Sequence, residues 1–221
     1  MPPSSNIPAQ NVCAVVLSGG QGSRMGGVDK GLQTFRGQAL ALNAVQRLSG
    51  QTTGSPAQIA INANRNLREY AAWGHPVWPD ASADYAGPLA GFLSALRHCT
   101  QDTPAFDYLL TVPCDVPLFP LDLLEHMAQA LMHNGGEIAV AVAPEPTQSG
   151  QLLLRSQPVF CLMQTQLVAS LDTYMATGGR KVNAWINQHH TVEVPFNRAE
   201  DDPHAFANAN TLEQLRQLEQ P

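Results

Sequence analysis

A strand-like segment that runs straight into a glycine-rich loop is the feature that most constrains this chain. Residues 12–17 form an apolar run rich in β-branched side chains, which predicts a buried strand, and the run stops abruptly at Ser-Gly-Gly. The following loop, residues 18–31, contains six glycines, and its only charged side chains are Arg24, Asp29 and Lys30. Because glycine lets backbone N–H groups approach a ligand closely, the loop is typical of a polyphosphate site whose charge the two cations neutralise.

The loop does not match either of the two familiar phosphate-binding motifs. A Walker A loop has a lysine directly after its second fixed glycine, and Val28 stands there in this chain. The dinucleotide-binding fingerprint Gly-x-Gly-x-x-Gly fails at Met25. That fingerprint also expects an acidic residue near the end of the second strand, which here ends at Asn62. Both a P-loop protein and a dinucleotide oxidoreductase are therefore disfavoured.

Length and composition predict one cytoplasmic α/β domain over residues 12–221. The net charge of −6 and the charged fraction of 14% disfavour a protein that binds nucleic acid or a membrane surface, because either partner needs a basic face. No apolar run approaches the ~18 residues that a membrane span needs. The four cysteines lack metal-ligand spacing, so reduced thiols are expected. Residues 1–11, which are rich in Pro and Ser, predict a disordered N-terminal tail.

Apolar periodicity predicts strands and helices that alternate along the rest of the chain. The pattern favours a Rossmann-like, three-layer α/β/α fold with a mostly parallel central sheet. Strands are expected at 58–61, 75–78, 107–112, 138–142, 152–154, 159–163 and 192–196, with a turn-rich loop at 144–150. Helices are expected at 39–48, 65–73, 89–96, 120–134, 167–175 and 211–218.

The strand at 107–112 ends in Pro-Cys-Asp-Val-Pro, residues 113–117. Ligands of an open α/β sheet bind at the carboxyl ends of its strands, so Asp115 lies where a metal ligand is useful. Mg²⁺ suits this position, since it takes one or two protein carboxylates and leaves its other positions to water and phosphate oxygens. On the residues alone, a turn-capping role for Asp115 is the alternative. For Cys114, buried packing is favoured over thiol chemistry.

Four further residues lie where a nucleotide could contact them. Asn62 and Asp80 both follow short strands and could touch the base or ribose, although turn and cap roles compete. Gly87 and Gly91 lie near the start of a helix and could leave a bare patch for a ring or phosphate, although close packing of the helix on the sheet explains them equally well.

Two motifs resemble a known family. The spacing Leu-x-Gly-Gly-x-x-x-Arg-Met-Gly-x-x-Lys at 17–30 and the Pro-Cys-Asp-x-Pro at 113–117 are similar to the signatures of pyrophosphorylase-like nucleotidyltransferases. Gly-Gly-Val-Asp-Lys-Gly-Leu at 26–32 most resembles the molybdenum cofactor guanylyltransferases. The resemblance implies a nucleotide-diphospho-sugar transferase-like fold, with a nucleotide-binding half at about 12–117 and an acceptor-binding half at about 118–221.

The implied reaction transfers GMP from GTP to the terminal phosphate of molybdopterin, with or without molybdenum, and releases pyrophosphate. The resemblance implies catalytic roles for Arg24, Lys30 and Asp115, with Asp115 holding Mg²⁺. The GTP-binding residues it implies are Leu17, Ser18, Gly19, Gly20, Lys30, Asn62, Asp80, Gly87, Gly91 and Asp115. It implies acceptor contacts at Asn208 and Asn210; Arg180 and Lys181 are a second candidate phosphate site, with a solvated helix cap as the alternative. Enzymes that deliver the pterin and accept the finished cofactor are further expected partners.

Other functions stay open at this point. No strong general base stands near the motifs, which suits an acceptor phosphate that is already anionic at neutral pH. Sugar-phosphate nucleotidyltransferases share that feature. Gly19 lies where cytidylyltransferase relatives usually have alanine, which favours guanine. A cytidylyltransferase, a sugar-phosphate nucleotidyltransferase and a non-catalytic GTP- or cofactor-binding protein remain the alternatives.

Overall fold

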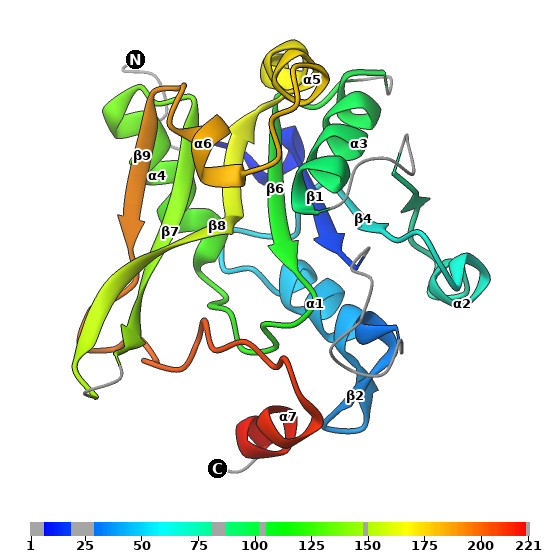
Figure 1. Ribbon diagram of the computed structural model, residues 1–221, viewed down its shortest axis with the longest axis vertical. Helices are drawn as coiled ribbons and strands as arrows, with labels where there is room; N and C mark the ends of the chain where they lie inside the picture. Colours follow the sequence, from blue (N-terminus) through cyan, green and yellow to red (C-terminus); the bar gives the residue numbers. More distant parts are fainter. Residues whose placement is uncertain (1–6, 19–28, 81–86, 102–104, 148–149, 220–221) are drawn as a thin grey trace.

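A seven-stranded mixed sheet forms the centre of the protein (Figure 1). The structure is a computed structural model that describes residues 7–18, 29–80, 87–101, 105–147 and 150–219. The strand order is β5-β4-β1-β6-β8-β7-β9, and β8 alone runs antiparallel to its neighbours. The strands are β1 (Val12–Leu17), β4 (Gln58–Asn62), β5 (Val77–Trp78), β6 (Tyr108–Pro113), β7 (Ile138–Pro146), β8 (Leu152–Gln164) and β9 (Thr191–Pro195).

Helices cover both faces of this sheet, which confirms the predicted three-layer α/β/α fold. One face packs against α1 (Leu40–Ser49) and α4 (Leu123–Asn134). The other packs against α3 (Pro88–Gln101), α5 (Val168–Ala176) and α6 (Val182–Ile186), the last of which the sequence did not predict. The smaller elements are α2 (Leu67–Ala71), α7 (Leu212–Glu219), a hairpin of β2 (Thr34–Phe35) and β3 (Gln38–Ala39), and the 3-10 turns Ala9–Asn11, η3 (Lys30–Leu32) and Thr165–Leu167.

The central strand β1 explains why the sequence shows a continuous apolar run rather than an alternating one. Val12, Ala14 and Val16 point into the core under α1 and α4, whereas Cys13 and Val15 point into the core under α3. All five are fully buried. A parallel strand buried on both faces needs apolar side chains at every position, and its carboxyl end then opens directly into the glycine-rich loop.

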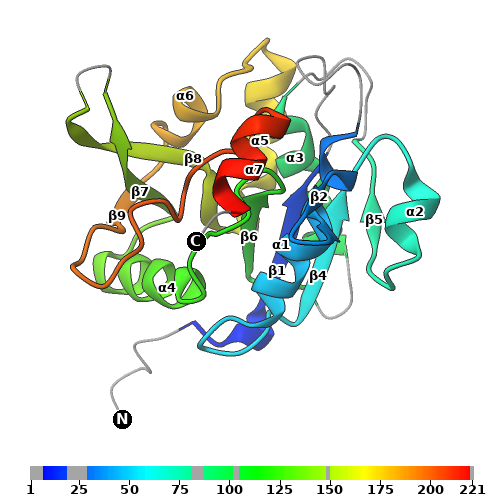
Figure 2. The same ribbon diagram turned by 90° about the horizontal axis from the view of Figure 1, so that it is seen from below.

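Two local expectations are wrong. The expected strands at 152–154 and 159–163 are one strand, β8, and the first part of the expected loop at 144–150, residues 144–146, belongs to β7. These strands form a long hairpin that projects beyond the sheet (Figures 1 and 2). Pro158, which cannot donate a ladder hydrogen bond, lies in a register shift where pairing jumps from Val140–Cys161 to Ala141–Gln157. The shift allows the strand to continue past the proline.

The expected disordered tail over residues 1–11 extends too far along the chain. Ile7 is only 3% exposed and belongs to the core between the sheet and α1, and Ala9–Asn11 form a 3-10 turn. The prediction used composition alone and therefore missed the buried side chain of Ile7. Among the described residues, no helix is both long and apolar enough to cross a membrane.

After β9 the chain crosses the lower end of the sheet as a strap, residues 196–211, and ends in α7 (Figures 1 and 2). Phe196 and Phe206 pack with ring centroids 5.2 Å apart, and Phe206 meets Phe160 of β8 edge-on at 5.0 Å. Helix α7 packs against β2, and the backbone N–H of Arg36 donates to Glu219 at 2.6 Å. The strap therefore joins the two halves of the sheet at the end where β1 and β6 terminate.

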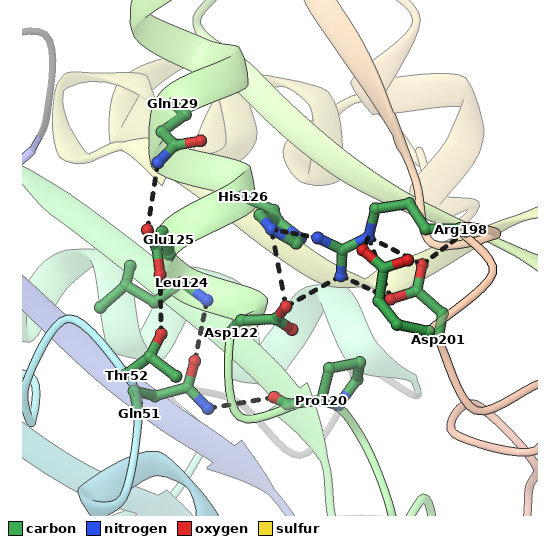
Figure 3. Close-up of polar contacts among 11 residues, drawn as sticks. Gln51, Thr52, Pro120, Asp122, Leu124, Glu125, His126, Gln129, Arg198 and Asp201 are labelled. Carbon is green, nitrogen blue, oxygen red and sulfur yellow. Dashed lines mark hydrogen bonds and ion pairs between the residues drawn. The ribbon is translucent and has the colours of Figure 1, made fainter.

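Gln51 joins the end of α1 to the start of α4 (Figure 3). Its Nε2 donates to the carbonyls of Arg47 and Pro120, each at 3.1 Å, and its Oε1 accepts from the N–H of Leu124 at 2.8 Å. Asp122, the residue at the N-cap position of α4, makes no capping hydrogen bond of its own. Gln51 is 5% exposed, so its amide satisfies buried backbone groups that water does not reach.

We expect Gln51→Leu to lower the free energy of unfolding by about 2–4 kcal/mol, because the buried backbone groups lose their partners while the volume is roughly kept. Urea denaturation measures the change. Gln129→Leu, at an exposed position of α4, should change the free energy of unfolding by less than about 0.5 kcal/mol. Equal effects of the two substitutions would show that the hydrogen bonds of Gln51 to the backbone of α1 and α4 do not contribute to stability.

Arg198 fixes the strap to α4 (Figure 3). Its Nη2 donates to Asp122 at 2.9 Å, and its Nε lies 3.1 Å from both carboxylate oxygens of Asp201. Hydrogen bonds from this guanidinium hold the pKa of Asp201 below its usual range. A carboxyl group with a lowered folded-state pKa stabilises the protein above its unfolded-state pKa, and this contribution is lost as the pH falls through the folded-state value.

Arg198→Met should therefore destabilise the protein at neutral pH by about 1 kcal/mol or less, since the pair is partly exposed. The difference from the wild type should shrink as the pH is lowered from about 6 to about 2, where Asp201 is protonated in both states. Thermal unfolding over this range measures it. A difference that does not change with pH would assign the effect to lost packing of the arginine stem.

Candidate active site

Lys30 and Asp115 form an ion pair beneath the carboxyl ends of β1 and β6. Lys30 Nζ lies 2.5 Å from Asp115 Oδ2, and the two side chains are 18% and 20% exposed. Lys30 begins η3 after the glycine-rich loop, and Asp115 follows β6. The N–H of Cys114 donates to the carbonyl of Leu17 at 3.2 Å, so the ends of the two strands are tied together. Two residues expected in one site are thus adjacent, although they are 85 positions apart in sequence.

Asn210 of the strap contacts the same lysine. Lys30 Nζ donates to Asn210 Oδ1 at 2.7 Å, and the neighbouring N–H of Ala209 donates to the carbonyl of Asp115 at 2.7 Å. The N–H of Asn210 is held by Gln214 Oε1 at 2.8 Å, at the start of α7. The strap therefore brings Asn210 from the far end of the chain to the Lys30–Asp115 pair. Asn208, the second expected asparagine, is exposed.

Asn62 and Asp80 also lie together, at the ends of β4 and β5. Asn62 Nδ2 donates to Asp80 Oδ1 at 2.9 Å and to the carbonyl of Trp78 at 2.9 Å. Asn64, which the sequence did not single out, donates to Asp80 Oδ2 at 2.8 Å and accepts from its N–H at 2.8 Å. Its position two residues after Asn62 was the available signal. The three side chains form one polar cluster next to the end of β1.

The two glycines near the start of α3 differ. A Cβ atom on Gly91 would lie 2.5 Å from Asn62 Oδ1 and 2.7 Å from a methyl group of Leu17, so α3 approaches the strand ends as closely as glycine permits. Gly87 is exposed with φ +114°, and nothing lies within 4 Å of the corresponding Cβ position. Close packing is thus observed at Gly91, while a ligand contact at either glycine stays a prediction.

Three expected residues, Gly19, Gly20 and Arg24, fall outside the described part of the chain. Their neighbour Ser18 is buried, and its N–H donates to the carbonyl of Asn62 at 2.8 Å, which extends the pairing of β1 with β4 by one residue. The described segment 7–18 therefore ends at Ser18 beside β4, at the carboxyl end of β1, which lies between β4 and β6.

Arg180 and Lys181 lie in the connection between α5 and α6. Arg180 Nη1 donates to the carbonyls of Met175 and Gly179 at 2.9 and 2.7 Å, which closes the end of α5. Lys181 is exposed at the N-cap position of α6. Figure 1 shows α5 beside the upper end of β6, opposite the strand's carboxyl end. The helix-cap interpretation is therefore observed for Arg180, and a phosphate contact stays a prediction.

Burial raises the pKa of the Cys114 thiol to about 12, with a further contribution from the nearby charge of Asp115. A thiol in this state is uncharged at neutral pH and is a poor nucleophile. The preference for packing over thiol chemistry agrees with its 5% exposure.

Asp115 is the candidate metal ligand. In the described part of the chain, Asp115 Oδ2 binds Lys30 and Oδ1 makes no hydrogen bond. No group of three or more His, Cys, Asp or Glu side chains gathers to hold a metal among the described residues. A single carboxylate suits Mg²⁺, which keeps several waters and binds substrate phosphates, better than it suits zinc.

Gly91→Ala should force Asn62 and Leu17 to shift and should lower the free energy of unfolding by about 1–3 kcal/mol, because the added methyl group overpacks the contact. Chemical denaturation measures the loss. Gln101→Ala, at an exposed position on the same helix, should stay within about 0.5 kcal/mol of the wild type. A neutral effect of Gly91→Ala would mean that α3 and the strand ends do not pack closely at this glycine.

Comparison with known proteins shows the family to which the chain belongs. A family model described as a MobA-like NTP transferase domain matches residues 14–194. The chain is similar to a molybdenum cofactor guanylyltransferase of Albidiferax ferrireducens, with 54% identity over 96% of this chain and 98% of the relative. It is 53% identical to a molybdenum cofactor guanylyltransferase of an Acidovorax strain, over 96% of this chain and 97% of the relative.

Solved structures share the fold. A molybdopterin-guanine dinucleotide biosynthesis protein A of Archaeoglobus fulgidus superposes with a TM-score of 0.71 at 20% identity, covering 94% of this chain and 96% of that one. The 4-diphosphocytidyl-2C-methyl-D-erythritol synthase of Anaerococcus prevotii gives a TM-score of 0.67 at 10% identity, covering 96% and 95%. At these identities the likeness concerns architecture alone, and it agrees with the expected nucleotide-diphospho-sugar transferase-like fold. From the family model and the close relatives together, the chain belongs to the MobA-like NTP transferase family.

Proposed function

We propose that this protein is a molybdenum cofactor guanylyltransferase, which transfers GMP from GTP to the terminal phosphate of molybdopterin and releases pyrophosphate. The Lys30–Asp115 pair at the carboxyl ends of β1 and β6 carries the proposal. It lies where an open α/β sheet binds its ligands. Relatives of about half-identical sequence and nearly equal length bear this name.

Lys30 is assigned to the triphosphate and the departing pyrophosphate. Transfer to a phosphate acceptor needs little covalent work from the protein, so positioning and charge stabilisation supply most of the catalysis. The Lys30 side chain is only 18% exposed, so its charge keeps more of its electrostatic effect than that of a fully hydrated lysine. Arg24 is proposed as the second cation on the same phosphates.

Asp115 is assigned to Mg²⁺. Its Oδ1 is the atom available for an ion, since Oδ2 already accepts from Lys30. When bound, Mg²⁺ would supply positive charge to the phosphates of the donor. Asp115 would hold the ion, and the Lys30 ammonium group beside it would add a second positive charge for the donor's phosphates.

Base and acceptor contacts belong to the same proposal. The cluster of Asn62, Asn64 and Asp80 offers a carboxylate that could accept from a guanine ring N–H and amino group, with its orientation fixed by two amides. Asn208 and Asn210 are proposed for the pterin side. A cytoplasmic location and contacts with enzymes that deliver the pterin and accept the product are also proposed.

The decisive experiment mixes the protein with Mg²⁺, molybdopterin and each nucleoside triphosphate in turn and measures pyrophosphate. Of the nucleoside triphosphates, only GTP should release pyrophosphate, and this release should depend on both Mg²⁺ and molybdopterin. Release with CTP would favour a cytidylyltransferase, and release with a sugar phosphate in place of the pterin would favour a sugar-phosphate nucleotidyltransferase. Binding of GTP without release in any mixture would point to a non-catalytic protein.

Lys30→Ala and Asp115→Ala should each lower kcat by about two to four orders of magnitude, because each removes a group that acts on the charge of the transferred phosphate. Steady-state pyrophosphate release measures the loss. Arg97 and Asp172 form an exposed ion pair of 2.7 Å between α3 and α5 and supply matched controls. Arg97→Ala and Asp172→Ala should leave kcat unchanged; near-normal rates for the Lys30 and Asp115 variants would refute the assigned roles.

A further inference from the structure

Asp29, the residue directly before Lys30, is a buried carboxylate with its own set of hydrogen-bond donors. It is 7% exposed. Its Oδ1 accepts from the hydroxyl group of Tyr70 at 2.6 Å and from the N–H of Gly31 at 3.1 Å, and its Oδ2 accepts from Asn66 Nδ2 at 2.9 Å. No described cation forms an ion pair with it within 4.0 Å. A buried charge of this kind persists only where several donors compensate it.

The donors come from a separate element of the fold. Tyr70 lies on α2, is fully buried and packs edge-on against Trp73 with ring centroids 5.2 Å apart. Burial, then the hydrogen bond to Asp29 and its charge, raise the pKa of Tyr70 well above its usual range, so the phenol stays a donor. Asn66 precedes α2 with a left-handed φ of +52°, a conformation that few non-glycine residues adopt.

The same contacts fix the backbone on both sides of Lys30. Asp29 caps η3 through the N–H of Gly31, and the N–H of Gln33 donates to the carbonyl of Lys30 at 3.1 Å. A Cβ atom on Gly31 would lie 2.4 Å from the Tyr70 hydroxyl oxygen and 3.0 Å from Ser18 Oγ. The backbone therefore touches Tyr70 as closely as glycine allows. With both neighbours fixed, the Lys30 side chain leaves η3 in one direction, toward Asp115 and Asn210.

We propose that Asp29, held by Tyr70 and Asn66, is a positioning residue that aims the Lys30 ammonium group at the reaction centre. The inference deepens the proposed function, because it concerns the lysine assigned to the triphosphate. Asp29 does not itself reach the Lys30–Asp115 pair through any described contact; it acts through the backbone of η3. Three hydrogen bonds, rather than the negative charge as such, carry the effect.

The test compares Asp29→Ala with Asp29→Asn. Alanine removes all three acceptor contacts, so kcat should fall by about 100-fold, as expected when a catalytic group is displaced by about 1 Å. The KM for GTP should change less than kcat. The asparagine side chain keeps an oxygen that accepts from Tyr70 and Gly31. Its NH₂ group can donate to the amide oxygen of Asn66 if the Asn66 amide flips. For Asp29→Asn, kcat should therefore lie within about tenfold of the wild type.

A matched pair of hydroxyl deletions separates positioning from stability. Tyr70→Phe removes a buried hydroxyl that donates to Asp29, and Thr165→Val removes a buried hydroxyl that donates to the carbonyl of Phe106 at 2.6 Å, at the other end of β6. Both should lower the melting temperature, but only Tyr70→Phe should lower kcat. If Asp29→Ala and Tyr70→Phe keep kcat values near that of the wild type, the proposal is overturned.

A readout independent of catalysis uses the lysines themselves. Lys30 and Lys181 are the only two lysines of the chain, so protein labelled with [15N]lysine gives two side-chain ammonium signals, and Lys181→Arg assigns them. The Lys30 signal should be distinct in the wild type and in Asp29→Asn, and should move toward that of a hydrated lysine in Asp29→Ala. An unmoved signal refutes the positioning role. If the Lys30 signal moves in Asp29→Ala but the wild-type protein transfers no GMP, the proposed function is refuted and the positioning role stands.

Discussion

The contact between Lys30 and Asp115 depends on the parallel alignment of two adjacent strands. β1 pairs with β6 in register from Val12 with Tyr108 to Leu17 with Pro113, so the carboxyl ends of the two strands lie side by side. Both partners of the ion pair are about four-fifths buried. Removing one partner would leave the other charge poorly solvated, which is why such pairs are more sensitive to single substitutions than exposed ones. The central strands must therefore be held rigidly, and the apolar side chains on both faces of β1 do this.

The strap from 196 to 211 is the second constraint on the site. It has no regular secondary structure over most of its length, yet Phe196, Phe206 and Arg198 fix it to the sheet and to α4. At its far end, α7 packs on the β2–β3 hairpin that follows η3. Asn210 is thus held from both sides. A neutral amide oxygen that is fixed in this way can bind the lysine without competing with Asp115 for charge.

Much of the fold could be predicted from the sequence because its central strands and helices have clear periodicity. The buried strand at 12–17, the strand ends at Asn62 and Pro113, and a helix at 89–96 within the longer α3 follow directly from apolar patterning. The errors lie where local composition misleads: Pro158 suggested a break in β8, and a Pro- and Ser-rich start hid the buried Ile7. Within the site, the contact between Lys30 and Asn210 spans 180 positions and depends on the path of an irregular strap, which no local pattern encodes. Asn64, Tyr70 and the role of Asp29 were missed for the same reason, since their partners are distant in sequence.

The two acceptors of Lys30 are chemically different, and this difference matters if Asp115 takes a metal ion. A carboxylate shared between an ammonium group and a divalent cation binds each of them less strongly than it would bind either alone, because the two positive charges repel. Asn210 carries no charge, so its hydrogen bond to Lys30 is not weakened by the metal in that way. The lysine would then keep one fixed partner while its contact with Asp115 loosens, and its charge would become available to phosphate oxygens. Asp29 restrains the backbone and Asn210 restrains the ammonium end, so the side chain is held at both ends when its ionic partner is engaged elsewhere.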